Sequence, residues 1–160
     1  MFNIGDKIIY PSYGGGIINS IEEKEVLGER KRYYILKMVI SEMEIMVPVD
    51  NINNLGIRHI IDKSQVEDLI KILKDEQGNM DKKWNKRYRD NMDKIKTGDI
   101  YEIAVVVRDL MIQDKEKGLS TGEKKMLNDA KDMLISELVL VLNENAEKVK
   151  ELIDNTVIND

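Results

Sequence analysis

The sequence predicts an α+β fold, in which a small, twisted β-barrel precedes a bundle of about five helices. Before Gly56, short β-prone runs alternate with glycine, proline and charged residues. After Gly56, apolar residues recur at steps of three and four, and two Ser-x-x-Glu patterns indicate helix starts. We therefore expect a barrel domain in residues 1–58 and a helical domain in residues 62–160.

Local composition predicts the strands in order along the chain. Residues 7–10 are a β-prone run that Pro11 ends, and residues 26–29 are typical of a strand end and a turn. Residues 33–40 and 43–47 predict two further strands, the second of which ends at Pro48. The neighbouring carboxylates of residues 22–23 stand beside a lysine in an apparent turn, which favours a solvated surface over acid–base chemistry.

The run Gly14-Gly15-Gly16 is the one glycine-rich segment of the chain. A phosphate-binding loop requires a Lys-Ser or Lys-Thr pair after the glycines and a helix at its end. Here Ile17 and an apparent strand follow instead. The run therefore predicts a sharp turn of the barrel.

Capping residues and glycines predict the helices. The pattern Ser64-x-x-Glu67 predicts the cap of a first helix that Gly78 ends, and a second helix is expected over residues 81–96, before Gly98. Asp99 is expected to cap a third helix, which Gly118 ends. Ser120 and Glu123 predict the start of a long fourth helix, and Asn143 or Asn145 is expected to separate it from a fifth.

Composition excludes several classes of function. The chain has 160 residues and a formal net charge of −5, which argues against a protein that coats nucleic acid by bulk charge. It has no cysteine and one histidine, His59, so no thiolate or two-histidine metal site can form. No apolar run reaches membrane-spanning length, and the N-terminus lacks a signal-peptide pattern. We expect a cytoplasmic protein that is not an enzyme and uses no metal or cofactor, with His59 structural or solvent-facing.

Positive charge is concentrated around the only tryptophan. Residues 80–98 hold seven Lys or Arg and three Asp residues, and Trp84 and Tyr88 lie among them one helical turn apart. Cations bind DNA phosphates, and a flat apolar side chain can wedge into a disturbed base step. The candidate DNA-binding residues here are Lys83, Trp84, Lys86, Arg87 and Arg89. The alternative is that Trp84 packs in the core, on one helix face with Tyr88, Met92 and Ile95.

A second basic segment begins the predicted fourth helix. Lys124 and Lys125 follow Ser120-Thr121-Gly122-Glu123, where free backbone N–H groups and the positive end of the helix dipole would favour a phosphate. The alternative is a capped helix with solvated lysines, and the Glu123 carboxylate would offset part of the attraction. Both interpretations stay open on this segment alone.

Several motifs resemble the CarD family (CarD/CdnL-like) of bacterial transcription regulators that bind RNA polymerase. The opening GDKIIYPSYG of residues 5–14 is one of them, and it is shared with the polymerase-binding module of transcription-repair coupling factors. The more specific motifs lie in the helical part: WNKRYRDN at 84–91, KTGDI at 96–100, VVVRDL at 105–110 and GLSTGEKKML at 118–127. The resemblance spans nearly the whole chain in order.

The resemblance implies a Tudor-like (SH3-like) barrel that docks on the β subunit of RNA polymerase, and a helical domain that contacts promoter DNA. It implies that Trp84 wedges into the minor groove at the upstream edge of the melted region. It also places further residues near the two partners: Arg89 and Lys124 near DNA phosphates, and Lys24, Glu44, Ile45, Met46 and Val47 near the polymerase. Two positions depart from relatives, which carry a basic residue in place of Met46 or Gln113.

The hypothesis is therefore a regulator of transcription initiation that stabilises the promoter open complex with little sequence specificity. Its expected partners are the polymerase β subunit and promoter DNA, which would hold it at the nucleoid, and not a membrane or a small-molecule substrate. One alternative is a protein–protein adaptor on the polymerase, without DNA contact and with Trp84 in the core. Another is a Tudor-type reader of modified side chains, which needs an aromatic cage built from Tyr10, Tyr13, Tyr33 and Tyr34.

Overall fold

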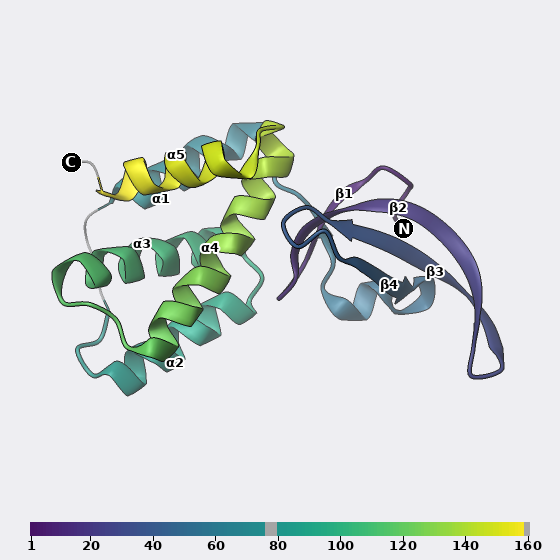
Figure 1. Cartoon of the computed structure of the whole chain (residues 1–160), viewed down its shortest axis with the longest axis horizontal. Helices are drawn as coiled ribbons and strands as arrows, with labels where there is room; N and C mark the ends of the chain where they lie inside the picture. Colours follow the sequence, from purple (N-terminus) through teal and green to yellow (C-terminus); the bar gives the residue numbers. More distant parts are fainter. Residues whose placement is uncertain (76–79, 159–160) are drawn as a thin grey trace.

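The computed structural model describes residues 1–75 and 80–158. It places an antiparallel sheet beside a set of packed helices, as Figure 1 shows. Strands occur only before residue 60 of the described chain, and all α-helices begin after residue 65. The α+β class is therefore confirmed, although the expected end of the barrel at residue 58 falls inside the last strand.

In the described part of the chain, the sheet contains five strands in the order β4-β3-β2-β1-β5, and every neighbouring pair is antiparallel. Their bounds are Lys7–Tyr10 (β1), Gly14–Val26 (β2), Glu29–Met38 (β3), Glu44–Pro48 (β4) and Arg58–His59 (β5), with a 3₁₀ helix η1 at Val49–Leu55. The sheet is curved and not closed, so β4 and β5 are edges (Figure 1). Its apolar core includes Ile8, Ile18, Tyr34, Leu36 and Val47.

A long hairpin of β2 and β3 extends away from the helices (Figure 1). Its turn is at Leu27 and Gly28, which both have positive φ, so the turn predicted at 26–29 is confirmed. Glu22 and Glu23 are paired inside β2, opposite Tyr33 and Arg32, so the apparent turn at these carboxylates is wrong.

The glycine run is part of a strand, and the prediction of a sharp turn there is wrong. The turn lies just before it, where Ser12 has φ of 76°, and β2 begins at Gly14. A Cβ added at Gly15 would lie 2.8 Å from Leu140 Cδ1 and 3.0 Å from the Ser136 carbonyl oxygen. Because these atoms belong to the fourth helix, glycine is needed here for the sheet to approach the helices closely.

Within residues 1–75 and 80–158, five α-helices follow the sheet, as predicted: α1 Val66–Lys74, α2 Trp84–Lys96, α3 Ile100–Glu116, α4 Thr121–Leu142 and α5 Ala146–Ile158. Their shared core contains the expected apolar stripes, including Leu69, Ile103, Leu110, Leu134 and Ile153. None of these helices is long and apolar enough to cross a membrane, within the part of the chain that the structure describes.

Most helix boundaries agree with the capping residues. Asp99 Oδ1 accepts a hydrogen bond from Tyr101 N at 2.9 Å, and Gly98, Gly118 and Asn143 have positive φ where helices end. The first helix differs: Asp62 and Gln65 form the capping box, through a short 3₁₀ turn η2 at Lys63–Gln65, so the prediction of a Ser64 cap is wrong. The expected stop at Gly78 lies outside the described residues.

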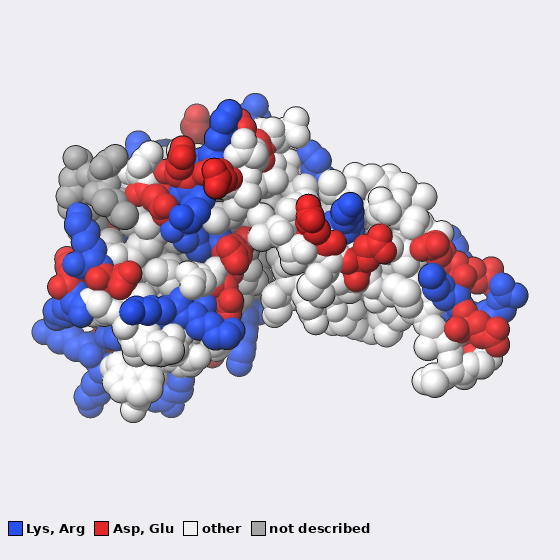
Figure 2. Space-filling model, in the orientation of Figure 1, with Lys and Arg blue, Asp and Glu red and all other residues white. Residues whose placement is uncertain are grey.

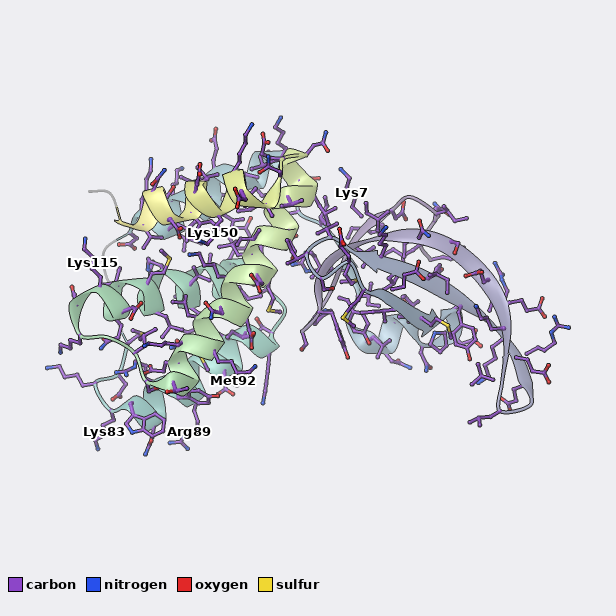
Figure 3. The ribbon with its side chains drawn as sticks, in the orientation of Figure 1. Lys7, Lys83, Arg89, Met92, Lys115 and Lys150 are labelled. Carbon is purple, nitrogen blue, oxygen red and sulfur yellow. The ribbon has the colours of Figure 1, made fainter. Side chains whose placement is uncertain are left out.

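The sheet and the helices meet in a contact built on α4. Gly15 N donates to Ser136 Oγ at 2.8 Å, and Lys7 Nζ donates to the Leu140 carbonyl at 3.0 Å. The Arg58 guanidinium donates to both carboxylate oxygens of Glu137, at 2.9 and 2.8 Å. Figure 3 shows Lys7 at this junction. These bonds hold the two parts in one arrangement.

Candidate nucleic-acid interface

Trp84 is the first residue of α2 and is exposed. Its side chain retains 58% of its accessible surface, and its ring meets the Tyr88 ring edge-on at a centroid distance of 6.4 Å. The turn before the helix is held by Asp81 Oδ1, which accepts from Lys83 N at 2.9 Å. That hydrogen bond lowers the pKa of the Asp81 carboxyl. Trp84 therefore stands clear of the core.

The predicted apolar stripe of α2 is correct in part. Tyr88, Met92 and Ile95 are half-buried against the helical core, whereas Trp84 is not among the core residues. The core placement of Trp84 is therefore wrong in this structure. A helix's first residue can project beyond the neighbouring helices, and periodicity along the helix does not reveal this.

Arg87 is a buried ion-pair residue. Its Nε and Nη2 atoms donate to the two Glu123 carboxylate oxygens at 2.6 and 2.8 Å, and Arg87 is 9% exposed. The hydrogen bonds from Arg87 lower the pKa of the Glu123 carboxyl below its usual value. Arg87 is therefore not available to a DNA phosphate, and its placement among the DNA-binding residues needs correction.

Sequence reasoning missed this pair because it assigned Glu123 to a capping box. Ser120 Oγ does accept from Glu123 N at 3.2 Å, as the box requires. The Glu123 carboxylate, however, lies 36 residues along the chain from Arg87 and is bonded to it. Only the packing of α2 on α4 brings the two together, and no local pattern indicates it.

Four exposed cations lie beside Trp84, two just before α2 and two in its first turns. They line one shallow depression together with Trp84 and Asn85: Lys82, Lys83, Lys86 and Arg89. Lys86 Nζ lies 3.4 Å from an Asp81 carboxylate oxygen, an interaction that solvent screens. Figure 3 shows Lys83 and Arg89 at the same end of the helix.

The start of α4 adjoins this depression. A Cβ at Gly122 would lie 3.6 Å from Tyr88 Cε2, the ring that Trp84 contacts. Lys124 and Lys125 follow and are exposed, and Lys125 Nζ is 2.9 Å from an Asp129 carboxylate oxygen, which raises the pKa of Lys125. The two basic segments that sequence analysis treated separately therefore form one continuous region.

We call this region the basic surface: Lys82, Lys83, Trp84, Asn85, Lys86, Arg89, Lys124 and Lys125. Figure 2 shows Lys and Arg side chains gathered at this end of the helical part. Its arrangement has two chemical capabilities. Flexible cations can hold phosphates, and an exposed indole supported by a second ring can stack on or wedge between bases.

The proposed polymerase contact residues lie on or near a sheet edge. β4 is an edge strand, and the strand register places Glu44, Met46 and Lys24 on one face of the sheet. Ile45 and Val47 point to the other face, where Val47 is 1% exposed and belongs to the core. Val47 therefore belongs to the core of the sheet, and its side chain is not available to a partner.

The tyrosines do not form a cage. Tyr33 and Tyr34 are both buried, and the Tyr34 hydroxyl oxygen accepts from Phe2 N at 3.2 Å. The rings of Tyr10 and Tyr13 contact each other at a centroid distance of 4.6 Å, tilted by 52°. The aromatic side chains needed by a reader of modified residues are thus dispersed. His59 is exposed, beside the Phe2 ring, and no cluster of metal-ligating side chains occurs in residues 1–75 and 80–158.

Comparison with known proteins identifies both parts of the chain. Residues 2–61 match the CarD-like/TRCF RID domain, and residues 68–154 match the CarD C-terminal domain. A Bacillus subtilis (strain 168) protein named "Putative transcription factor YdeB" is 45% identical over 150 residues, which covers 94% of this chain and 98% of that protein. The sequence motifs, the Tudor-like sheet and the helical part thus all agree with these matches, and the chain belongs to the CarD family of transcription regulators.

Proposed function

We propose that this regulator docks on the β subunit of RNA polymerase through the edge of its sheet and stabilises the promoter open complex by wedging Trp84 at the upstream fork of the bubble. The observation that carries the proposal is the exposed Trp84 ring, which lines one depression together with four cations of the basic surface. An adaptor that binds only proteins has no need of phosphate-binding cations around an exposed indole. We therefore favour DNA contact.

The energetics of such a wedge are modest. Holding a base step unstacked costs a few kcal/mol, which contacts of the cations with phosphates and of the indole with bases must offset. A protein that binds only the opened promoter shifts the opening equilibrium by its difference in affinity for the two forms. If binding stabilises the open promoter by a net of about 1–2 kcal/mol, the ratio of open to closed promoter rises about 5–30-fold.

Docking on polymerase would compensate for the weak affinity of the basic surface for DNA. The whole chain carries a net charge of −5, so the free protein should bind DNA weakly and with strong salt dependence. A tether makes the DNA contact intramolecular, at an effective concentration on the order of millimolar. An edge strand such as β4 can dock by pairing its main chain with a partner strand, which tolerates Met46 in place of a basic residue.

The Trp84→Ala variant tests the wedge. We expect the lifetime of open complexes on an unstable promoter to fall about 5–30-fold relative to wild type, because the alanine side chain cannot reach the bases. Polymerase binding should be unchanged, since Trp84 is the first residue of α2 and is not part of the sheet. The lifetime of the open complex is measured with purified bacterial polymerase after a competitor is added. An unchanged lifetime in the variant would refute the wedge role of Trp84.

Met46→Glu is the matched variant for the tether. Met46 is an exposed β4 residue, so this change should weaken polymerase binding while leaving the fold intact. Its defect in open-complex lifetime should disappear at high protein concentration, because mass action restores docking. The Trp84→Ala defect should persist at saturation. If both defects respond alike to concentration, tether and wedge are not separate functions.

Salt dependence tests the cations of the basic surface. In Lys86→Ala/Arg89→Ala, the slope of log affinity against log salt for a duplex with a preformed bubble should decrease in magnitude by about 0.9 for each phosphate that the variant no longer neutralises. The control is Lys148→Ala/Lys150→Ala, which removes two exposed cations from α5. Fluorescence anisotropy measures both. An equal change in the control would mean that net charge, not this surface, governs binding.

A further inference from the structure

A cleft lies between the sheet and the helices, on the side of α4 that faces the strands. It has a volume of about 390 Å³, within the range of roughly 300–1,000 Å³ typical of ligand sites. One wall comes from the turns that follow β1 and β3, and the other from α2 and α4. No residue of the basic surface or of the proposed docking edge lines it. The cleft is therefore separate from both proposed contacts.

The lining is mainly apolar and rich in thioethers. Met92, Met126 and Met133 line it, with Ile95 on the helical side and Ile40 on the sheet side. Met92, labelled in Figure 3, lies on α2. Methionine side chains are flexible and polarisable, and they adapt to ligands of varied shape. The lining thus suits the apolar body of a small molecule.

The charged side chains that line the cleft are all acidic among the described residues. Asp129 and Asp132 line it, and none of its lining residues in the described chain is basic. The Asp129 carboxylate is paired with Lys125, whereas Asp132 makes no hydrogen bond or ion pair within residues 1–75 and 80–158. Asp132 is exposed to solvent; partial desolvation and the neighbouring Asp129 charge raise the pKa of its carboxyl, and the Lys131 charge opposes this shift. Figure 2 shows acidic side chains on this side of the helical part.

The sheet side of the cleft shows local strain and exposed apolar groups. Ser12 and Glu42, one in each turn, have φ of 76° and 59°, a conformation that residues other than glycine adopt at a cost. The same turns expose Tyr13, Ile40 and Met43 to solvent. An aromatic ring at the rim of an acidic cleft favours a cation, which it attracts through its π face.

We propose that this cleft binds a small organic cation with an apolar body, such as an aryl- or alkylammonium ion. The apolar body would lie against the methionine and isoleucine side chains, and the ammonium group would lie beside Asp132 and the Tyr13 ring. Because the two walls belong to the sheet and to the helices, the occupant contacts both parts. Its binding therefore stabilises their arrangement, and with it the spacing between β4 and Trp84.

Methionine-methyl NMR of the full chain provides the test. The probes are 2-phenylethylammonium chloride, the neutral 2-phenylethanol and the anionic 3-phenylpropionate, titrated at neutral pH. We expect the cation to shift the methyl resonances of Met92, Met126 and Met133 in preference to those of the exposed Met1 and Met46, which lie outside the turns that line the cleft. The neutral probe should bind about tenfold more weakly, and the anion should bind least.

Charge variants complete the test. Asp132→Asn should reduce affinity for the cation about tenfold without unfolding, since its carboxylate has no partner to lose among the described residues. Asp114→Asn makes the same change at an exposed position of α3 that does not line the cleft, and should leave affinity unchanged. Equal binding of the three probes, no shift at the three methyl groups, or equal effects of the two variants would overturn the proposal.

Discussion

Replacing Arg58 by alanine is expected to lower the free energy of unfolding by about 3–5 kcal/mol, the range for removing one partner of a buried ion pair. The reason is the position of Glu137, which is 0% exposed and takes hydrogen bonds from Arg58 and from Ile61 N. Without the guanidinium, its carboxylate is left buried beside one remaining donor. Urea denaturation followed by circular dichroism measures the loss.

Two controls make the Arg58 result specific. Arg89→Ala removes an exposed guanidinium and should change stability by less than about 0.5 kcal/mol. The double variant Arg58→Met/Glu137→Leu removes both charges together and should recover most of the stability, because no buried charge is left unpaired. A change below about 1 kcal/mol in Arg58→Ala would mean that water reaches Glu137 and that the pair does not hold the two parts together.

Arg87→Ala is expected to have the other large effect, because it leaves the Glu123 carboxylate, 1% exposed, without its bidentate partner. The free energy of unfolding should again fall by about 3–5 kcal/mol. The pair also holds the start of α4 against α2, so it positions Trp84 relative to Lys124. DNA affinity should therefore fall by a similar factor at low and high salt. A loss confined to low salt would instead indicate a direct phosphate contact.

The pH dependence of stability gives an independent measure of the same pair. Arg87 lowers the pKa of Glu123 in the folded protein below its ordinary value of 4.5. A carboxyl with a lowered folded pKa stabilises the protein above the unfolded pKa, and this contribution is lost as pH falls toward the folded pKa. The stability difference between wild type and Arg87→Ala should therefore narrow from pH 7 to pH 3.5. A constant difference would contradict the assigned ion pair.

The boundaries of most elements could be predicted because their causes are local. Pro11 and Pro48 end or bound strands, Leu27 and Gly28 make the hairpin turn, and Asp99 caps its helix through a neighbour two residues away. The apolar stripes of α3 and α4 likewise follow from the helical repeat. The motifs around Trp84 and Lys124 were sufficient to indicate the family without a structure.

The roles of other residues depended on atoms far along the chain. The sequence around Gly15 predicts a turn, whereas α4 occupies the space that a Gly15 side chain would need. The sequence around Arg87 predicts a phosphate ligand, whereas Glu123 binds its guanidinium. Trp84 fitted a core stripe by periodicity, yet it stands exposed at the end of its helix. Propensity and capping act over a few residues and are therefore present in the sequence. Burial and ion pairing depend on which helices pack together, and only the tertiary structure decides that.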